Sequence, residues 1–223
     1  MELLSAEHVV AIALTAVLCV LALWAVRVRP GAWVQPASRA LGALILAGLV
    51  TEQTAVIARG DWSPDVYLPL QLSDAVTIVA VLALWTGRSL LVELTYFWGL
   101  TAALGAVLTP DTGRGFPDVT FFTFFVTHSG AVIAAVVLVA GRRMAPRSGA
   151  VRRACLATLA VGAVAALGNL LTRGNYMFLR EKPDGSLLDL MGPWPLYIAG
   201  AGALGLALFA ALDAPFRRRS RNG

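Results

Sequence analysis

Apolar residues form seven long runs along the chain, separated by short polar segments. The runs cover roughly residues 8–26, 38–57, 68–86, 90–108, 119–140, 152–172 and 194–213. About 20 mostly apolar residues suffice for a helix to cross a membrane. The pattern therefore predicts an all-α fold, a polytopic membrane protein built as a bundle of seven transmembrane helices. Only a tight turn containing Gly87 can join the third and fourth helices.

The composition excludes a soluble globule. Of the 223 residues, 58% are hydrophobic and only 14% are charged, and the mean hydropathy is +0.73. Soluble domains carry about 25% charged residues, so a soluble fold of this chain would leave a very large apolar surface exposed. We expect a single transmembrane domain over residues 1–213, followed by a basic cytoplasmic tail over residues 214–223.

Basic residues gather at alternate ends of the predicted helices. Thirteen of the 18 lie at one set of ends: Arg27, Arg29, Arg39, Arg88, Arg142, Arg143, Arg147, Arg152, Arg153, Arg217, Arg218, Arg219 and Arg221. The opposite ends hold Arg59, Arg114, Arg173, Arg180 and Lys182, mixed with acidic residues. The positive-inside rule then predicts an outside N-terminus, a cytoplasmic C-terminus and a multi-pass protein of the plasma membrane.

This charge distribution also bears on partners. The net charge of +5 comes from short clusters at helix ends, so it does not indicate nucleic acid binding. We expect membrane lipids as partners, with the tail from Arg217 to Arg221 attracting anionic headgroups. The first apolar run follows Glu2, Glu7 and His8, without the basic region of a signal peptide, and is predicted to be a retained helix.

Three ionisable residues interrupt the predicted helices: Glu52, Asp74 and His128. Such residues are costly in a bilayer and usually face a cavity or a partner. From the direction of each helix, all three lie between the midplane and the outer surface. Glu93 is nearer the cytoplasmic end, and we expect it to be an interfacial charge close to Arg88.

Uncharged polar residues fall at the same depth: Gln71, Ser73 and Asn169. Taken singly, each polar residue favours a structural role, such as an ion pair of Asp74 or Glu52 with Arg173 or Arg180. Because they come from four helices at one depth, we favour a functional cavity over a purely structural network.

The segment Asn175–Pro183 is the longest polar and aromatic interlude, and Gly192–Tyr197 is its partner. Asn175, Tyr176 and Arg180 can form directional contacts there. We expect this segment to fold over the mouth of the polar cavity, with Asn175 and Arg180 holding a lipid phosphate.

These residue types suit nucleophilic chemistry. A serine hydroxyl such as Ser73 needs a base to take its proton, and His128 is the histidine expected at that depth. Asp74 or Glu52 could orient the imidazole, and amides of Asn169, Asn175 or Gln71 could stabilise an oxyanion. One histidine without a cysteine at that depth does not make a zinc site, so we expect no metal, and no motif indicates a cofactor.

Six motifs resemble, in order, those of the YwaF-like family of small bacterial integral membrane proteins. They are Leu68–Asp74, Tyr96–Gly99, Leu108–Asp111, Phe124–His128, Asn175–Pro183 and Gly192–Tyr197. That family is similar to an animal multispanning acyltransferase that moves acyl chains between phospholipids and lysophospholipids. The resemblance implies an acyl-carrying cysteine assisted by a histidine.

The third helix departs from the family pattern Leu-Pro-Leu-His-Leu-Cys-Asp. Gln71 stands in place of the histidine and Ser73 in place of the cysteine, whereas His128 matches. The leading hypothesis is a phospholipid transacylase or acyltransferase with Ser73, His128 and Asp74 as catalytic residues. The alternatives are a lipid or small-ligand binding or transport protein that uses Glu52, Asp74 and His128, and a scaffold whose polar cluster only holds helices together.

Overall fold

The computed structural model describes residues 4–110, 114–183 and 186–221, and every regular element within these ranges is helical. Glu2, Asp111 and residues 222–223 lie outside the described ranges. The last helix continues through the predicted tail to Arg221 and contains Pro215, and the division into a transmembrane domain and a tail stays a prediction. The side chains beyond Arg217 are outside the described part.

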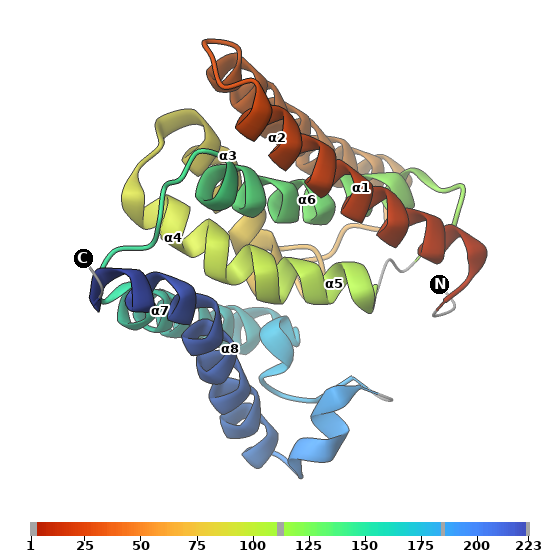
Figure 1. The fold of residues 1–223 in the computed structure, drawn as a ribbon. Helices are drawn as coiled ribbons and strands as arrows, with labels where there is room; N and C mark the ends of the chain where they lie inside the picture. The colour runs from red at the N-terminus through yellow and green to blue at the C-terminus, as the bar shows by residue number, and fades with distance from the viewer. Residues whose placement is uncertain (1–3, 111–113, 184–185, 222–223) are drawn as a thin grey trace.

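Seven helical rods make up the described chain (Figure 1). Their bounds are α1 Ala6–Val28, α2 Val34–Arg59, α3 Leu72–Thr86, α4 Ser89–Trp98 with α5 Leu104–Leu108, α6 Val119–Ala135, α7 Ala150–Thr172 and α8 Leu196–Arg221. A π-helical turn, Gly99–Ala103, joins α4 to α5, and a second, Val136–Gly141, extends α6. Short 3₁₀ turns cover Tyr176–Phe178 and Leu187–Met191.

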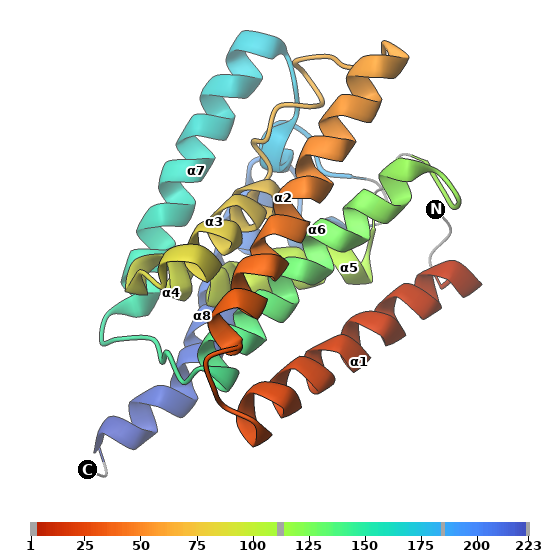
Figure 2. The same ribbon diagram turned by 90° about the horizontal axis from the view of Figure 1, so that it is seen from above.

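Six of these rods are long and apolar enough to cross a membrane, and α3, with 15 residues, is shorter. The prediction of a helical membrane protein is therefore confirmed, whereas seven spans and their orientation stay predictions. The first turn of α1 and the last turn of α8 lie at opposite ends of the molecule, as an odd number of passes requires (Figure 2).

The third helix begins at Leu72 and not at residue 68 as predicted. Gly60, with a φ of 74°, ends α2, and a non-helical segment then runs to Gln71. Pro69 lacks an N–H group and keeps the residue before it away from helical geometry, so a helix cannot start earlier at low cost. The predicted tight turn after this helix is present, with Gly87 at a φ of 63°.

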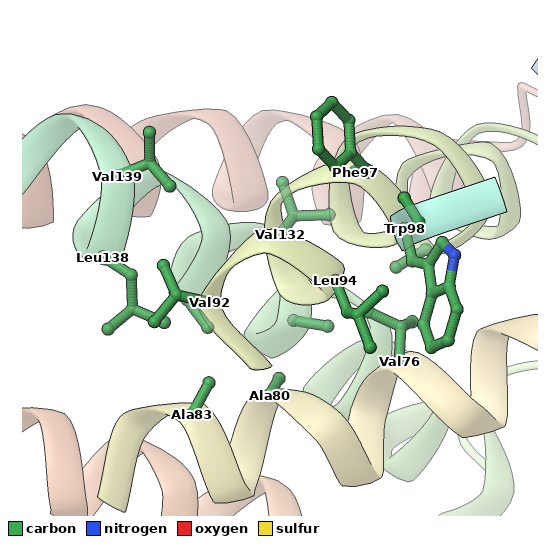
Figure 3. Close-up of a cluster of buried hydrophobic side chains, with 14 of the residues drawn as sticks. Val76, Ala80, Ala83, Val92, Leu94, Phe97, Trp98, Val132, Leu138 and Val139 are labelled. Carbon is green, nitrogen blue, oxygen red and sulfur yellow. The ribbon is translucent and has the colours of Figure 1, made fainter. Parts of the chain in front are cut away.

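The core lies where α3, α4 and α6 meet. Figure 3 shows Val76 and Ala80 of α3, Phe97 and Trp98 of α4 and Val132 of α6 turned toward one another. All of these are at most 4% exposed. Gly99 allows α4 to approach α6 closely, because a Cβ there would lie 3.1 Å from the carbonyl oxygen of Ala131.

Helix α1 lies on one side of this core, while α7 and α8 lie on the other (Figures 1 and 2). Three polar contacts hold α1, one of them from Arg27 to the carbonyl oxygen of Ala140 at 2.7 Å. The Nε2 of His8 lies 3.0 Å from the carbonyl oxygen of Val107, and the hydroxyls of Thr15 and Ser129 share a 2.7 Å hydrogen bond. His8 is fully buried, so its ring is an interior group that the sequence analysis did not anticipate.

Glu93 is also buried, and its partners are Arg147 and Arg153 rather than Arg88 as expected. Its carboxylate accepts hydrogen bonds from Arg147 at 2.8 Å and from Arg153 at 2.8 Å, while only 2% of its side chain is exposed. The two arginines flank the start of α7. This double ion pair therefore joins α4 to α7 at one end of the bundle.

We predict that Glu93→Ala lowers the free energy of unfolding by roughly 1–3 kcal/mol, since it removes the charge-assisted hydrogen bonds from two arginines that stay partly solvated. Thermal unfolding of the purified protein measures this effect. Glu181→Ala is the matched control, because that exposed carboxylate makes no ion pair in the described chain. Equal melting temperatures for the two variants would contradict the structural role of Glu93.

Asp118 joins the start of α6 to the end of α2. Its carboxylate accepts hydrogen bonds from the N–H and hydroxyl of Thr120 at 2.9 and 2.8 Å, and it pairs with Arg59 at 3.0 Å. The bonds from Thr120, followed by the contact with Arg59, lower the pKa of Asp118 from 3.8 to about 2. The side chain is therefore both the N-cap of α6 and a link to α2.

A depressed pKa in the folded state means that the ionised carboxylate favours folding above the ordinary pKa of 3.8. This contribution is lost as the pH falls from that value through about 2. We expect Asp118→Asn, which keeps a good N-cap, to flatten the fall of melting temperature over this window. Asp65→Asn is the control. A fall as steep as that of the parent protein would show that Asp118 does not carry this dependence.

Candidate functional site

Three mutually packed helices, α2, α3 and α6, each contribute one ionisable residue to the interior: Glu52, Asp74 and His128. A Cβ on Gly48 would lie 3.0 Å from the side chain of Thr127, so α2 and α6 touch beside the histidine. Glu52 is one turn further along α2. Asp74 lies near the start of α3, which packs against α2. The structure therefore brings these three predicted residues into one region.

His128 has a defined tautomer. Its Nδ1 lies 2.8 Å from the carbonyl oxygen of Phe124, and its ring stacks on the Phe124 ring with centroids 4.2 Å apart. A carbonyl oxygen only accepts, so Nδ1 carries the proton and Nε2 of the neutral ring carries a lone pair. Nε2 makes no hydrogen bond within the described chain. The ring can therefore accept a proton from a group that approaches Nε2.

Ser73 lies in the first turn of α3, partly buried, and its hydroxyl makes no hydrogen bond in the part of the chain described. The N–H groups of a first helical turn have no partner within the helix, so Leu72 and Ser73 present donors beside this hydroxyl. Asp74 caps the same helix, since its Oδ2 accepts the N–H of Gln71 at 3.1 Å.

Gln71, Asn169 and Tyr176 anchor the Asn175–Pro183 segment. The Oε1 of Gln71 accepts the N–H of Met177 at 2.7 Å. The side chain of Asn169 forms two hydrogen bonds with the backbone of Tyr176, at 3.0 and 2.6 Å. These bonds hold the backbone of Met177 at a φ of 55°. A residue other than glycine adopts this conformation only where its surroundings impose it.

The Tyr176 side chain, 1% exposed, reaches the non-helical segment before α3. Its hydroxyl donates to the carbonyl oxygen of Pro64 at 2.8 Å and accepts the N–H of Leu68 at 2.9 Å. That segment is partly exposed and forms no regular helix, so these two bonds help to fix its backbone. Tyr176 therefore connects the Asn175–Pro183 segment to the start of α3.

Asn175 and Arg180 make their contacts within the segment and with the end of α7. Asn175 donates to the carbonyl oxygen of Glu181 at 2.6 Å and accepts the N–H of Arg180 at 3.0 Å. The Nη1 of Arg180 donates to the carbonyl oxygen of Arg173 at 2.7 Å. All side-chain polar atoms of Asn175 are thus engaged in shaping the loop, whereas the guanidinium of Arg180 keeps further donors.

The predicted partner segment, Gly192–Tyr197, does contact this loop. The indole of Trp194 donates to the carbonyl oxygen of Leu179 at 3.1 Å. The hydroxyl of Tyr197 donates to the carbonyl oxygen of Phe178 at 2.6 Å. Two motifs separated in the sequence therefore form one layer at the C-terminal end of α7.

Several expected contacts are not formed. Within the described residues, no hydrogen bond joins Ser73 to His128, and no ion pair joins Asp74 or Glu52 to Arg173 or Arg180. The same part of the chain contains no group of three metal-ligating side chains. His8 and the Tyr176 hydroxyl were missed, since neither interrupts the hydrophobic pattern in a way that marks a buried contact.

The fold and these buried polar residues define a multi-pass helical membrane protein. Residues 3–213 match the family model of the TMEM164 family, and the chain belongs to this family. No curated protein and no solved structure is a significant match. The YwaF-like and transacylase resemblances remain expectations from the motifs.

We predict that Tyr176→Phe lowers the free energy of unfolding by roughly 1–3 kcal/mol, because it removes the two hydrogen bonds that the hydroxyl makes with the backbone of Pro64 and Leu68. Thermal unfolding in detergent measures the loss. Tyr67→Phe removes a hydroxyl that makes no hydrogen bond in the described chain and is the control. If both variants unfold at the parent's temperature, Tyr176 does not support the segment before α3.

Proposed function

We propose that this protein is a membrane-embedded phospholipid acyltransferase or transacylase whose polar cavity opens toward the outer surface. The observation that supports this best is the state of His128, a buried histidine with Nδ1 tied to Phe124 and a free lone pair on Nε2. It lies on a helix packed against α3, which carries Ser73 in its first turn.

The chemistry follows from these roles. The Oγ of Ser73 attacks the ester carbonyl of a donor phospholipid, and Nε2 of His128 takes the hydroxyl proton. The proton passes to the leaving lysophospholipid, and an acyl-serine remains. The hydroxyl of an acceptor lysophospholipid then attacks this ester, loses its proton to His128, and the serine is regenerated. The unpaired N–H groups of the first turn of α3 suit the oxyanion.

The lack of a Ser73–His128 hydrogen bond is compatible with this proposal, because catalytic hydrogen bonds often tighten only when substrate is bound. Glu52 and Asp74 would stabilise the imidazolium by their negative charge. Gln71, Asn169 and Tyr176 would hold the cover of the cavity in place, and Asn175 would shape the loop that carries Arg180 toward a headgroup.

A second candidate is a lipid or small-ligand binding or transport protein. It is favoured by the placement of Glu52 and Asp74 on two helices packed against each other, because carboxylates in membrane-spanning segments are costly and usually face a cavity or a partner. In this function Ser73 has no chemical role, whereas Asp74 and Glu52 are essential.

We expect the purified protein in lipid nanodiscs to convert labelled lysophospholipid to labelled diacyl product, detected by mass spectrometry. Ser73→Ala and His128→Ala should each reduce the rate by about 100-fold or more, the range for losing a general base or a nucleophile. Ser73→Cys should retain activity, because a thiol is the better nucleophile. Ser38→Ala, whose hydroxyl bonds its own helix at Val34, is the control.

No product from folded parent protein, or product that persists in Ser73→Ala, would refute the acyltransferase. Loss of ligand binding or transport in Asp74→Asn or Glu52→Gln, with Ser73→Ala unaffected, would instead support the second candidate.

A further inference from the structure

A groove of about 330 Å³ lies at the end of α7, beneath the Asn175–Pro183 segment. It is lined by Ala166, Asn169, Leu170, Arg173, Leu179 and Arg180. Its apolar lining comes from α7 and from Leu179, and its charged lining is two arginines. Leu170 is 81% exposed within a candidate membrane span, so this side of α7 faces the surroundings of the protein.

Both arginines have hydrogen-bond donors that are not used within the described chain. Arg173 ends α7 with a φ of 64°, and its guanidinium makes no hydrogen bond or ion pair in the described chain. The Nη1 of Arg180 is held by the carbonyl oxygens of Arg173 and Gly174, at 2.7 and 3.3 Å, while its Nε and Nη2 are unbonded there. Capping of the helix end explains the position of one nitrogen of Arg180, whereas it gives no role to the guanidinium of Arg173.

Two like charges in one groove, without a carboxylate paired to either, repel each other unless an anion binds between them. A guanidinium can form two parallel hydrogen bonds with phosphate oxygens, so a pair of them suits a phosphate group. The apolar lining continues from the arginines along α7 into the membrane-spanning part. A ligand that matches both halves carries a phosphate and an acyl chain.

We propose that this groove is a binding site for a membrane phospholipid, whose phosphate contacts Arg173 and Arg180 while one acyl chain lies against Ala166 and Leu170. Asn175 acts as a positioning residue, because its bond to the Arg180 N–H shapes the loop that presents the guanidinium. The site does not require the Ser73 chemistry and stands whether or not the protein transfers acyl groups.

Native mass spectrometry of the purified protein in detergent tests the proposal, with dioleoyl phosphatidylglycerol as the probe. Arg173→Gln should weaken its binding by about tenfold, the usual loss for one charge-assisted contact. Arg152→Gln is the matched control, since it removes an exposed arginine without a described partner from the other end of α7. Dioleoylglycerol, which lacks the phosphate, should bind at least tenfold more weakly to the parent protein.

Ala166→Phe, which fills the apolar part of the groove, should also weaken binding of the lipid. Ala160→Phe, on the exposed part of α7, should leave binding unchanged. If Arg173→Gln does not fold, the comparison of these two variants tests the site instead. Equal losses in Arg173→Gln and Arg152→Gln would overturn the site. Binding of dioleoylglycerol as tight as that of dioleoyl phosphatidylglycerol would also overturn the site, because the phosphate would then not be needed. Competition by inorganic phosphate as strong as that by the lipid would show a simple anion site and would overturn the lipid assignment.

Discussion

The structure depends on how the non-helical segment before α3 is paired. This segment forms no regular helix, so hydrogen bonds from side chains elsewhere in the protein determine its path. The hydroxyl of Tyr176 binds that segment at Pro64 and Leu68, and Asn169 holds Tyr176 by its backbone. The start of α3, and with it Ser73 and Asp74, is therefore positioned by residues about 100 places further along the chain.

Ion pairs join helices at both ends of the same bundle. Glu93 accepts hydrogen bonds from two arginines that follow α6, and Asp118 combines a helix cap with a contact to α2. The interior cluster of Glu52, Asp74 and His128 is different, because the described chain contains no cation paired with it. This contrast is the physical reason to treat the interior cluster as a site and the two end pairs as structural.

The helices could be predicted from the hydrophobic pattern, since long apolar runs have few other stable forms in a membrane. The start of α3 could not, although Pro69 was a signal against an earlier start. The convergence of Glu52, Asp74 and His128 followed from their shared depth, which is set by helix direction and rise per residue. The rotation of each helix about its axis is set by packing, so the partners of Glu93, the burial of His8 and the orientation of Ser73 were not accessible from the pattern.

The π-helical turn between α4 and α5 has a consequence for helix α1. Such a turn accommodates one residue more than an α-helical turn and rotates everything that follows it. Val107, whose carbonyl oxygen contacts His8, lies just beyond it. The contact of the first helix with Val107 thus relies on a local widening in a distant part of the chain. A change in that turn's length would move Val107 away from His8 as well as disturb the core around Gly99 and Ala103.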